Sequence, residues 1–113
     1  MSEDRTAETG CAEIVERNLP TITGLCRRFG VRRLDLFGSA ATGRFDPQRS
    51  DLDFLVEFEP DNTRNYADTY FGLLEQLETL FGRSVDLLTP LSLKNPYLRK
   101  RVLGERRMVF PRP

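Results

Sequence analysis

Two aspartates, Asp51 and Asp53, stand at the start of an apolar stretch that continues to Phe58. Because successive side chains of a β-strand point to opposite faces, both carboxylates would share one face, and Leu52, Phe54, Val56 and Phe58 would share the other. A carboxylate beside a protein core is costly unless it is paired or binds a metal ion. The spacing therefore predicts two acidic ligands held side by side on a rigid strand.

A third aspartate, Asp86, stands alone among the apolar residues of the stretch 84–89. Neither stretch contains a His, Lys or Arg that could neutralise these carboxylates. Mg²⁺ prefers carboxylate oxygens and completes its coordination with substrate phosphates. If the strand of Asp86 lies beside that of Asp53, the three carboxylates could hold two magnesium ions for in-line phosphoryl or nucleotidyl transfer.

The step Gly38-Ser39 ends the preceding apolar stretch. Glycine lets the backbone approach a phosphate, the serine hydroxyl can donate to a phosphate oxygen, and amides at a following helix start favour anions. The lysine of a P-loop is absent, which excludes P-loop chemistry. Each feature alone is commonly structural, as a turn, an exposed strand edge or a capping aspartate. Their combination at strand ends favours one shared site.

The elements that would position these residues follow from apolar spacing. A helical stripe from Ile14 to Phe29 is interrupted by Pro20, which predicts a short helix ending near Asn18 and a second helix with Pro20 in its first turn. Gly30 is placed to end the second helix. We expect further helices over 66–81 and from the cap Asn95 to about 104, and strands over 31–37, 52–58 and 84–89. Residues 108–110 form a short apolar piece.

The element order predicts one layered α/β (α+β) domain with a small sheet, spanning residues 1–113, of which 1–8 would be loose. The loop 40–50 is long enough for a broad hairpin or a short crossover, and its first half is expected to form a helical turn from Ser39. With no His and two Cys, a zinc site is not expected, and Cys26 falls at a core position.

Charge is balanced overall but unevenly distributed. The formal net charge is zero, so we expect no direct nucleic-acid binding driven by overall charge. The segment 91–113 nevertheless carries one acid, Glu105, and seven basic residues: Lys94, Arg99, Lys100, Arg101, Arg106, Arg107 and Arg112. This basic tail could meet an acidic partner, a nucleotide or a nucleic acid, or could be a solvated helix face. The N-terminal residues lack an apolar signal core and no stretch is long enough for a membrane helix, which predicts a cytoplasmic protein.

Together, Gly38-Ser39, Asp51-Leu52-Asp53 and Val85-Asp86-Leu87 resemble the minimal nucleotidyltransferases of the polymerase-beta-like superfamily, whose signature is Gly-Ser, a spacer and Asp-x-Asp. The resemblance covers residues 31–90 closely. It implies a small mixed sheet flanked by helices, magnesium bound by Asp51 and Asp53, a site completed by Asp86, and a nucleoside triphosphate contacted by Gly38 and Ser39.

Two features of the sequence depart from the family pattern. The spacer 40–50 has eleven residues, one more than the commonest form, and Thr42 stands where many relatives have arginine. Arg44 is a candidate replacement for that phosphate contact.

The resemblance also implies a partner, since minimal nucleotidyltransferases are commonly paired with a helical HEPN toxin. It predicts a magnesium-dependent antitoxin that transfers AMP from ATP to a toxin tyrosine within a hetero-oligomer, with the basic tail as a candidate docking surface. Two alternatives stay open. The domain could be a catalytically silent module that neutralises its partner by contact, or a nucleotidyltransferase that modifies a small molecule.

Overall fold

The computed structural model describes residues 13–43, 51–60 and 65–111 of the chain. The predicted loose segment 1–8 and Arg44 lie outside these ranges. The N-terminal helical stripe forms two helices, α2 (Glu13–Arg17) and α3 (Leu19–Arg28), with Pro20 in the first turn of α3. Gly30 follows α3 with φ of 68°, a left-handed conformation that suits glycine. The predicted break at the proline is therefore confirmed.

Within the described residues, four strands form one mixed sheet in the order β3-β2-β1-β4. They are β1 (Val31–Phe37), β2 (Leu52–Phe58), β3 (Val85–Leu88) and β4 (Arg107–Phe110). Strand β1 is antiparallel to β2 and β4, whereas β2 and β3 are parallel. The predicted fold class is confirmed, and the loop after β1 makes a hairpin connection. The apolar piece 108–110 belongs to the edge strand β4. This strand was not predicted, because so short a stretch has no periodic pattern and is defined by its pairing with β1.

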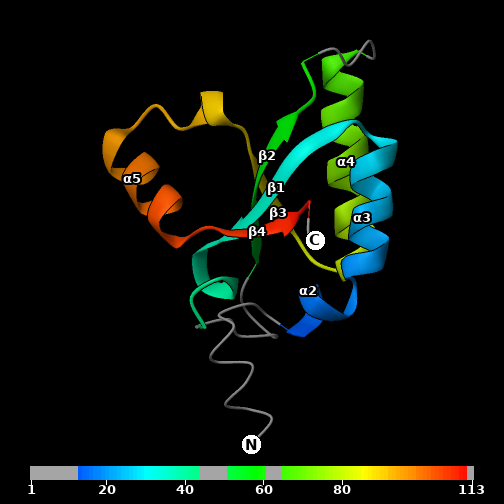
Figure 1. Cartoon of the computed structure of the whole chain (residues 1–113), viewed down its shortest axis with the longest axis horizontal. Coiled ribbons are helices and arrows are strands. Elements are labelled where there is room, and N and C mark those ends of the chain that lie inside the picture. The colour runs from blue at the N-terminus through cyan, green and yellow to red at the C-terminus, as the bar shows by residue number, and fades with distance from the viewer. Residues whose placement is uncertain (1–12, 44–50, 61–64, 112–113) are drawn as a thin grey trace, which may run out of the picture.

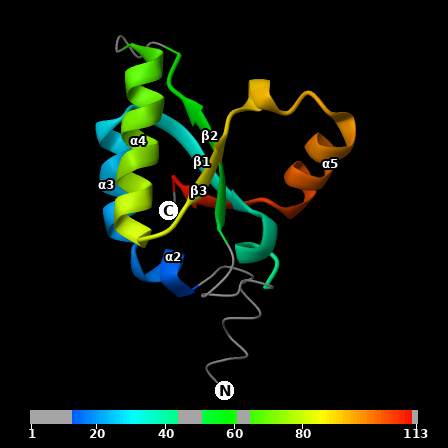
Figure 2. The same cartoon turned by 180° about the vertical axis from the view of Figure 1, so that it is seen from behind.

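Helices cover both faces of the sheet, as Figures 1 and 2 show. Helices α3 and α4 (Tyr66–Phe81) lie on one side, and α5 (Pro96–Glu105) lies on the other. The Asn65 side chain accepts a hydrogen bond from Asp68 N at the start of α4, and Gly82 ends it with φ of 64°. The Asn95 side chain caps α5 in the same way. None of the described helices is long and apolar enough to cross a membrane.

The two layers have separate apolar cores. The larger core fills the space between the sheet and helices α2, α3 and α4, and it includes Leu36, Phe54 and the buried Cys26. Burial raises the pKa of the Cys26 thiol to about 12, as expected for a core cysteine. A smaller cluster fixes α5 to the opposite face through the buried residues Phe37, Leu55, Leu93 and Val102. The face that carries the aspartates is thus covered by α5 alone among the described helices.

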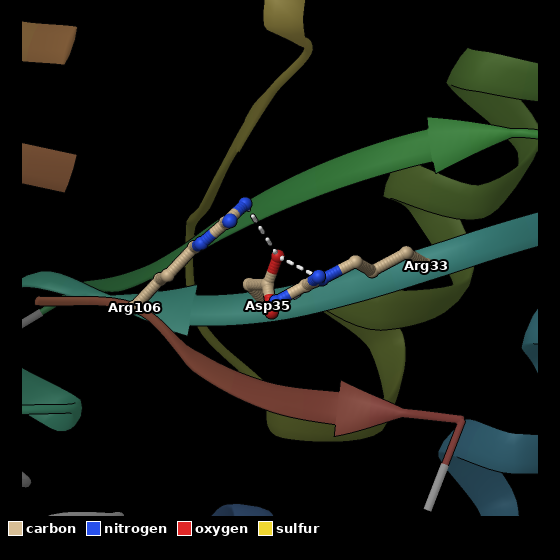
Figure 3. A network of polar contacts seen from close by, with 3 residues as sticks. All are labelled: Arg33, Asp35 and Arg106. Atoms are coloured by element: carbon tan, nitrogen blue, oxygen red, sulfur yellow. Dashed lines mark hydrogen bonds and ion pairs between the residues drawn. The ribbon is translucent and has the colours of Figure 1, made fainter. Parts of the chain in front are cut away.

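A buried carboxylate joins the end of α5 to the sheet. Asp35 on β1 is 1% exposed, and its Oδ2 lies 2.9 Å from Arg33 Nε and 3.6 Å from Arg106 Nη1. Figure 3 shows Asp35 between the two arginines. The next residue, Arg107, donates from Nε to the Ala41 carbonyl at 3.3 Å. These contacts hold the junction of α5 and β4 against β1 and against the turn that follows it.

Candidate active site

Strand register brings two of the predicted aspartates together. Asp53 on β2 pairs with Asp86 on the parallel strand β3, and it pairs with Phe37 at the end of β1. Because side chains at paired positions point to the same face, both carboxyl groups lie on the side of the sheet that α5 covers. The condition set by the sequence, that the strand of Asp86 neighbours that of Asp53, is met.

All five predicted site residues line one pocket of about 480 Å³: Gly38, Ser39, Asp51, Asp53 and Asp86. Asp53 is half-buried, whereas Asp51 and Asp86 are exposed. Two more residues, Arg101 and Glu105, reach the same pocket from α5. They were not predicted as site residues, because only the packing of α5 across the sheet brings them there. The i,i+4 spacing of opposite charges was the available signal.

The turn after β1 fits closely against Asp53. Gly38 has φ of 73°, and a Cβ atom at this position would overlap with Asp53 Oδ2. A 3₁₀ turn begins at Gly38, one residue earlier than predicted. The Thr42 hydroxyl donates to the Gly38 carbonyl at 3.0 Å, so the residue that departs from the family pattern stabilises this turn. Only glycine lets the chain pass this close to the carboxylate.

The pKa of Asp53 is raised to about 6, first by burial and then by a hydrogen bond with Asp86 and by the negative charges of Asp86 and Asp51. The positive charge of Arg101 acts in the opposite direction. A hydrogen bond between two carboxyl groups requires a shared proton, which occupies the place where a cation would neutralise both. The pair therefore has the chemistry of a divalent-cation site.

The described residues do not complete a metal site on their own. Within the ranges 13–43, 51–60 and 65–111, no three acidic, Cys or His side chains gather closely enough to hold a metal ion. Magnesium is ordinarily bound by one or two carboxylates together with substrate phosphates and water. The close pair Asp53 and Asp86, with open pocket beside it, fits that mode of binding.

Comparison with known proteins agrees with this geometry. The nucleotidyltransferase domain family matches residues 21–109. The protein adenylyltransferase MntA of Thermococcus cleftensis is 41% identical over 83 residues, which cover 72% of this chain and 77% of that protein. A solved structure described as a minimal nucleotidyltransferase has 36% identity and a TM-score of 0.69, and the match covers 84% of this chain and 92% of that one.

A solved complex of an MNT antitoxin with a tri-AMPylated HEPN toxin from Shewanella oneidensis also matches, with a TM-score of 0.59. The match covers 85% of this chain and 71% of that chain. At 20% identity this likeness shows a shared fold. The family match spans most of the chain, including the turn at Gly38 and both aspartate-bearing strands. The chain therefore belongs to the nucleotidyltransferase domain family.

Proposed function

We propose that this chain is a magnesium-dependent protein adenylyltransferase that transfers AMP from ATP to a tyrosine of a partner HEPN toxin, and so acts as its antitoxin. The observation that carries the proposal is the pairing of Asp53 with Asp86 beside the Gly38 turn. The 41% identity to a protein adenylyltransferase supports a protein acceptor. The fold shared with an antitoxin bound to an AMPylated HEPN toxin supports the choice of partner.

Each of the five pocket residues predicted from the sequence has a role in this reaction. Asp51, Asp53 and Asp86 would hold magnesium, which when bound supplies positive charge to the triphosphate and lowers the pKa of a nearby hydroxyl. The Gly38 backbone and the Ser39 hydroxyl would hold phosphate oxygens. Asp86, exposed at the pocket edge, would accept the proton of the acceptor hydroxyl.

The transfer itself is a displacement at phosphorus. The tyrosine oxygen forms a bond to the α-phosphorus of ATP, while the bond from that phosphorus to the oxygen bridging to the β-phosphate breaks. Pyrophosphate leaves with the electron pair, and the acceptor becomes a tyrosine AMP ester. The contribution of the chain is to orient the two reactants and to neutralise charge, which is the main requirement of phosphoryl-type transfer.

The basic tail contributes differently along its length. Arg106 and Arg107 make contacts within the chain, and Arg101 lines the pocket. Lys94, Arg99 and Lys100 are exposed beside the exposed Tyr97. This surface, formed by α5 and the residues just before it, supports docking of an acidic region of the toxin next to the pocket, in the cytoplasmic setting that the sequence predicts.

The test is incubation of the purified chain with its HEPN partner, magnesium and ATP labelled on the α-phosphate. We expect label on the partner, none after the acceptor tyrosine is changed to phenylalanine, and none with Asp53→Ala. Absence of transfer by the wild-type chain would overturn the enzymatic proposal. Partner neutralisation that survives both Asp51→Ala and Asp53→Ala would point to inhibition by contact, and label on a small molecule alone would point to a different acceptor.

A further inference from the structure

One basic side chain from α5 reaches the pocket that holds the aspartates. Among the described residues that line this pocket there are four acids, and Arg101 is the one base. A nucleoside triphosphate adds further negative charge to the same space. Because magnesium bound by the aspartates offsets only part of this charge, the guanidinium of Arg101 is the positive group among the described pocket residues that suits a phosphate.

The packing of α5 explains how Arg101 reaches the pocket. Val102 is fully buried against the sheet and the half-buried Leu98 packs beside it, so one stripe of the helix is fixed. Arg101 directly precedes Val102 and lies at the edge of this stripe, one turn before Glu105. The Arg101 Nε lies 3.8 Å from Glu105 Oε2, and the Arg101 side chain is 63% exposed. The arginine is thus anchored at its base and open to solvent at its tip.

We propose that Arg101 binds the β- and γ-phosphates of the nucleotide, the part released as pyrophosphate, with Glu105 as a positioning residue that holds the guanidinium at the pocket edge. This inference rests on the proposed function, and it adds the residue that recognises the leaving group. The α-phosphate must lie near Asp53, Asp86 and the turn at Gly38, where transfer takes place. Arg101 lies on α5 and not on the sheet, and its side chain is 63% exposed, which suits the outer end of the triphosphate.

The test is to measure binding of ATP and of AMP separately, by calorimetry with magnesium and without any partner. We expect Arg101→Ala to weaken ATP binding at least about tenfold and AMP binding less than about twofold, because a charge-assisted contact to phosphate contributes more than 1 kcal/mol. Arg101→Lys should recover part of the loss, since it keeps the charge without the planar fork. The matched control is Arg27→Ala, which removes one exposed positive charge from α3 in the other layer. It should leave both affinities unchanged.

Equal ATP affinity of wild type and Arg101→Ala would overturn the inference. Equal weakening of ATP and AMP binding would also overturn it, because it would show that Arg101 only offsets the charge of the aspartates. Glu105→Gln should weaken ATP binding about twofold to threefold in the wild-type background and have no effect in Arg101→Ala, as expected of residues that act together. A wild-type chain that binds ATP through Arg101 but transfers no AMP would overturn the proposed function alone.

Discussion

Two aspartates on the same face of the sheet, Asp35 on β1 and Asp53 on β2, have opposite electrostatic surroundings. Asp35 is 1% exposed and lies between Arg33 and Arg106, whose charges lower its pKa although burial raises it more. Asp53 is less buried, yet its closest charged neighbours are Asp86 and Asp51. The chain supplies cations to the first carboxylate. Among the described residues, the charges that act on the second are those of two acids, Asp86 and Asp51, and one arginine, Arg101.

The difference separates a structural carboxylate from one suited to bind a ligand. An ion pair completed within the chain stabilises the packing of α5 and β4, and adding an external cation there would gain nothing. A carboxyl pair that must share a proton gains from any divalent cation that replaces it. Function on this face is therefore predicted by what surrounds each aspartate and not by its depth of burial.

The largest expected effect is on transfer. Asp53→Asn should lower the rate of AMP transfer at least about a hundredfold, above the range typical of groups that only support a metal ligand. Asp35→Asn should retain most of the wild-type rate at a temperature at which it is folded, since Asp35 does not line the pocket. Initial rates with labelled ATP measure both. A similar loss of transfer rate in the two variants would contradict the distinction between a structural Asp35 and a ligand-binding Asp53.

The free energy of unfolding should show the reverse order, with a larger loss when Asp35 is replaced than when Asp53 is replaced. Asp35→Ala leaves two arginines without their buried partner, and loss of one member of a buried pair costs about 3–5 kcal/mol. Because the side chains of Arg33 and Arg106 are 31% and 28% exposed, we expect the lower end, about 3 kcal/mol. Urea denaturation measures this, and Asp53→Ala should be no less stable than wild type in the absence of metal. A larger loss for Asp53→Ala would contradict the assignment.

A smaller effect is expected from Gly38→Ala, which places a methyl group against the carboxylate of Asp53. We expect transfer to fall about tenfold, together with a strain cost of about 1 kcal/mol. Gly82→Ala is the matched control, because Gly82 also has positive φ but nothing lies within 4 Å of the added Cβ. It should lose similar stability and keep its transfer rate. Equal rates for the two variants would show that the contact with Asp53 has no consequence.

The smallest effect is on the pH dependence of stability without metal. Between the ordinary aspartate pKa of about 4 and the raised pKa of about 6, folded Asp53 holds a proton that the unfolded chain has lost. The free energy of unfolding should therefore fall as pH rises through this range. Urea titrations in a chelator should show a steeper fall for wild type than for Asp53→Asn, and added magnesium should reduce the difference. Parallel profiles would argue against the raised pKa.

Much of the architecture was predictable because the signals are local. The proline that separates α2 from α3, the glycine after α4 and the cap at Asn95 each act on residues a few positions away. The alternation in β2 likewise placed Asp53 on the face opposite Leu52, Phe54 and Val56, which belong to the larger core. The short strand β4 was missed, since its four residues carry no periodic pattern and depend on pairing with β1.

The sequence by itself determined which residue types could form the site: the glycine and serine after β1, Asp51 directly before β2, and one aspartate on each of β2 and β3. It could not determine that Asp53 and Asp86 share a register position, or that α5 brings Arg101 and Glu105 to the same pocket. Those facts depend on contacts between segments more than thirty residues apart, which local spacing does not encode. Tertiary structure also decided which aspartate is neutralised within the chain, because Arg106 reaches Asp35 only after β4 pairs with β1.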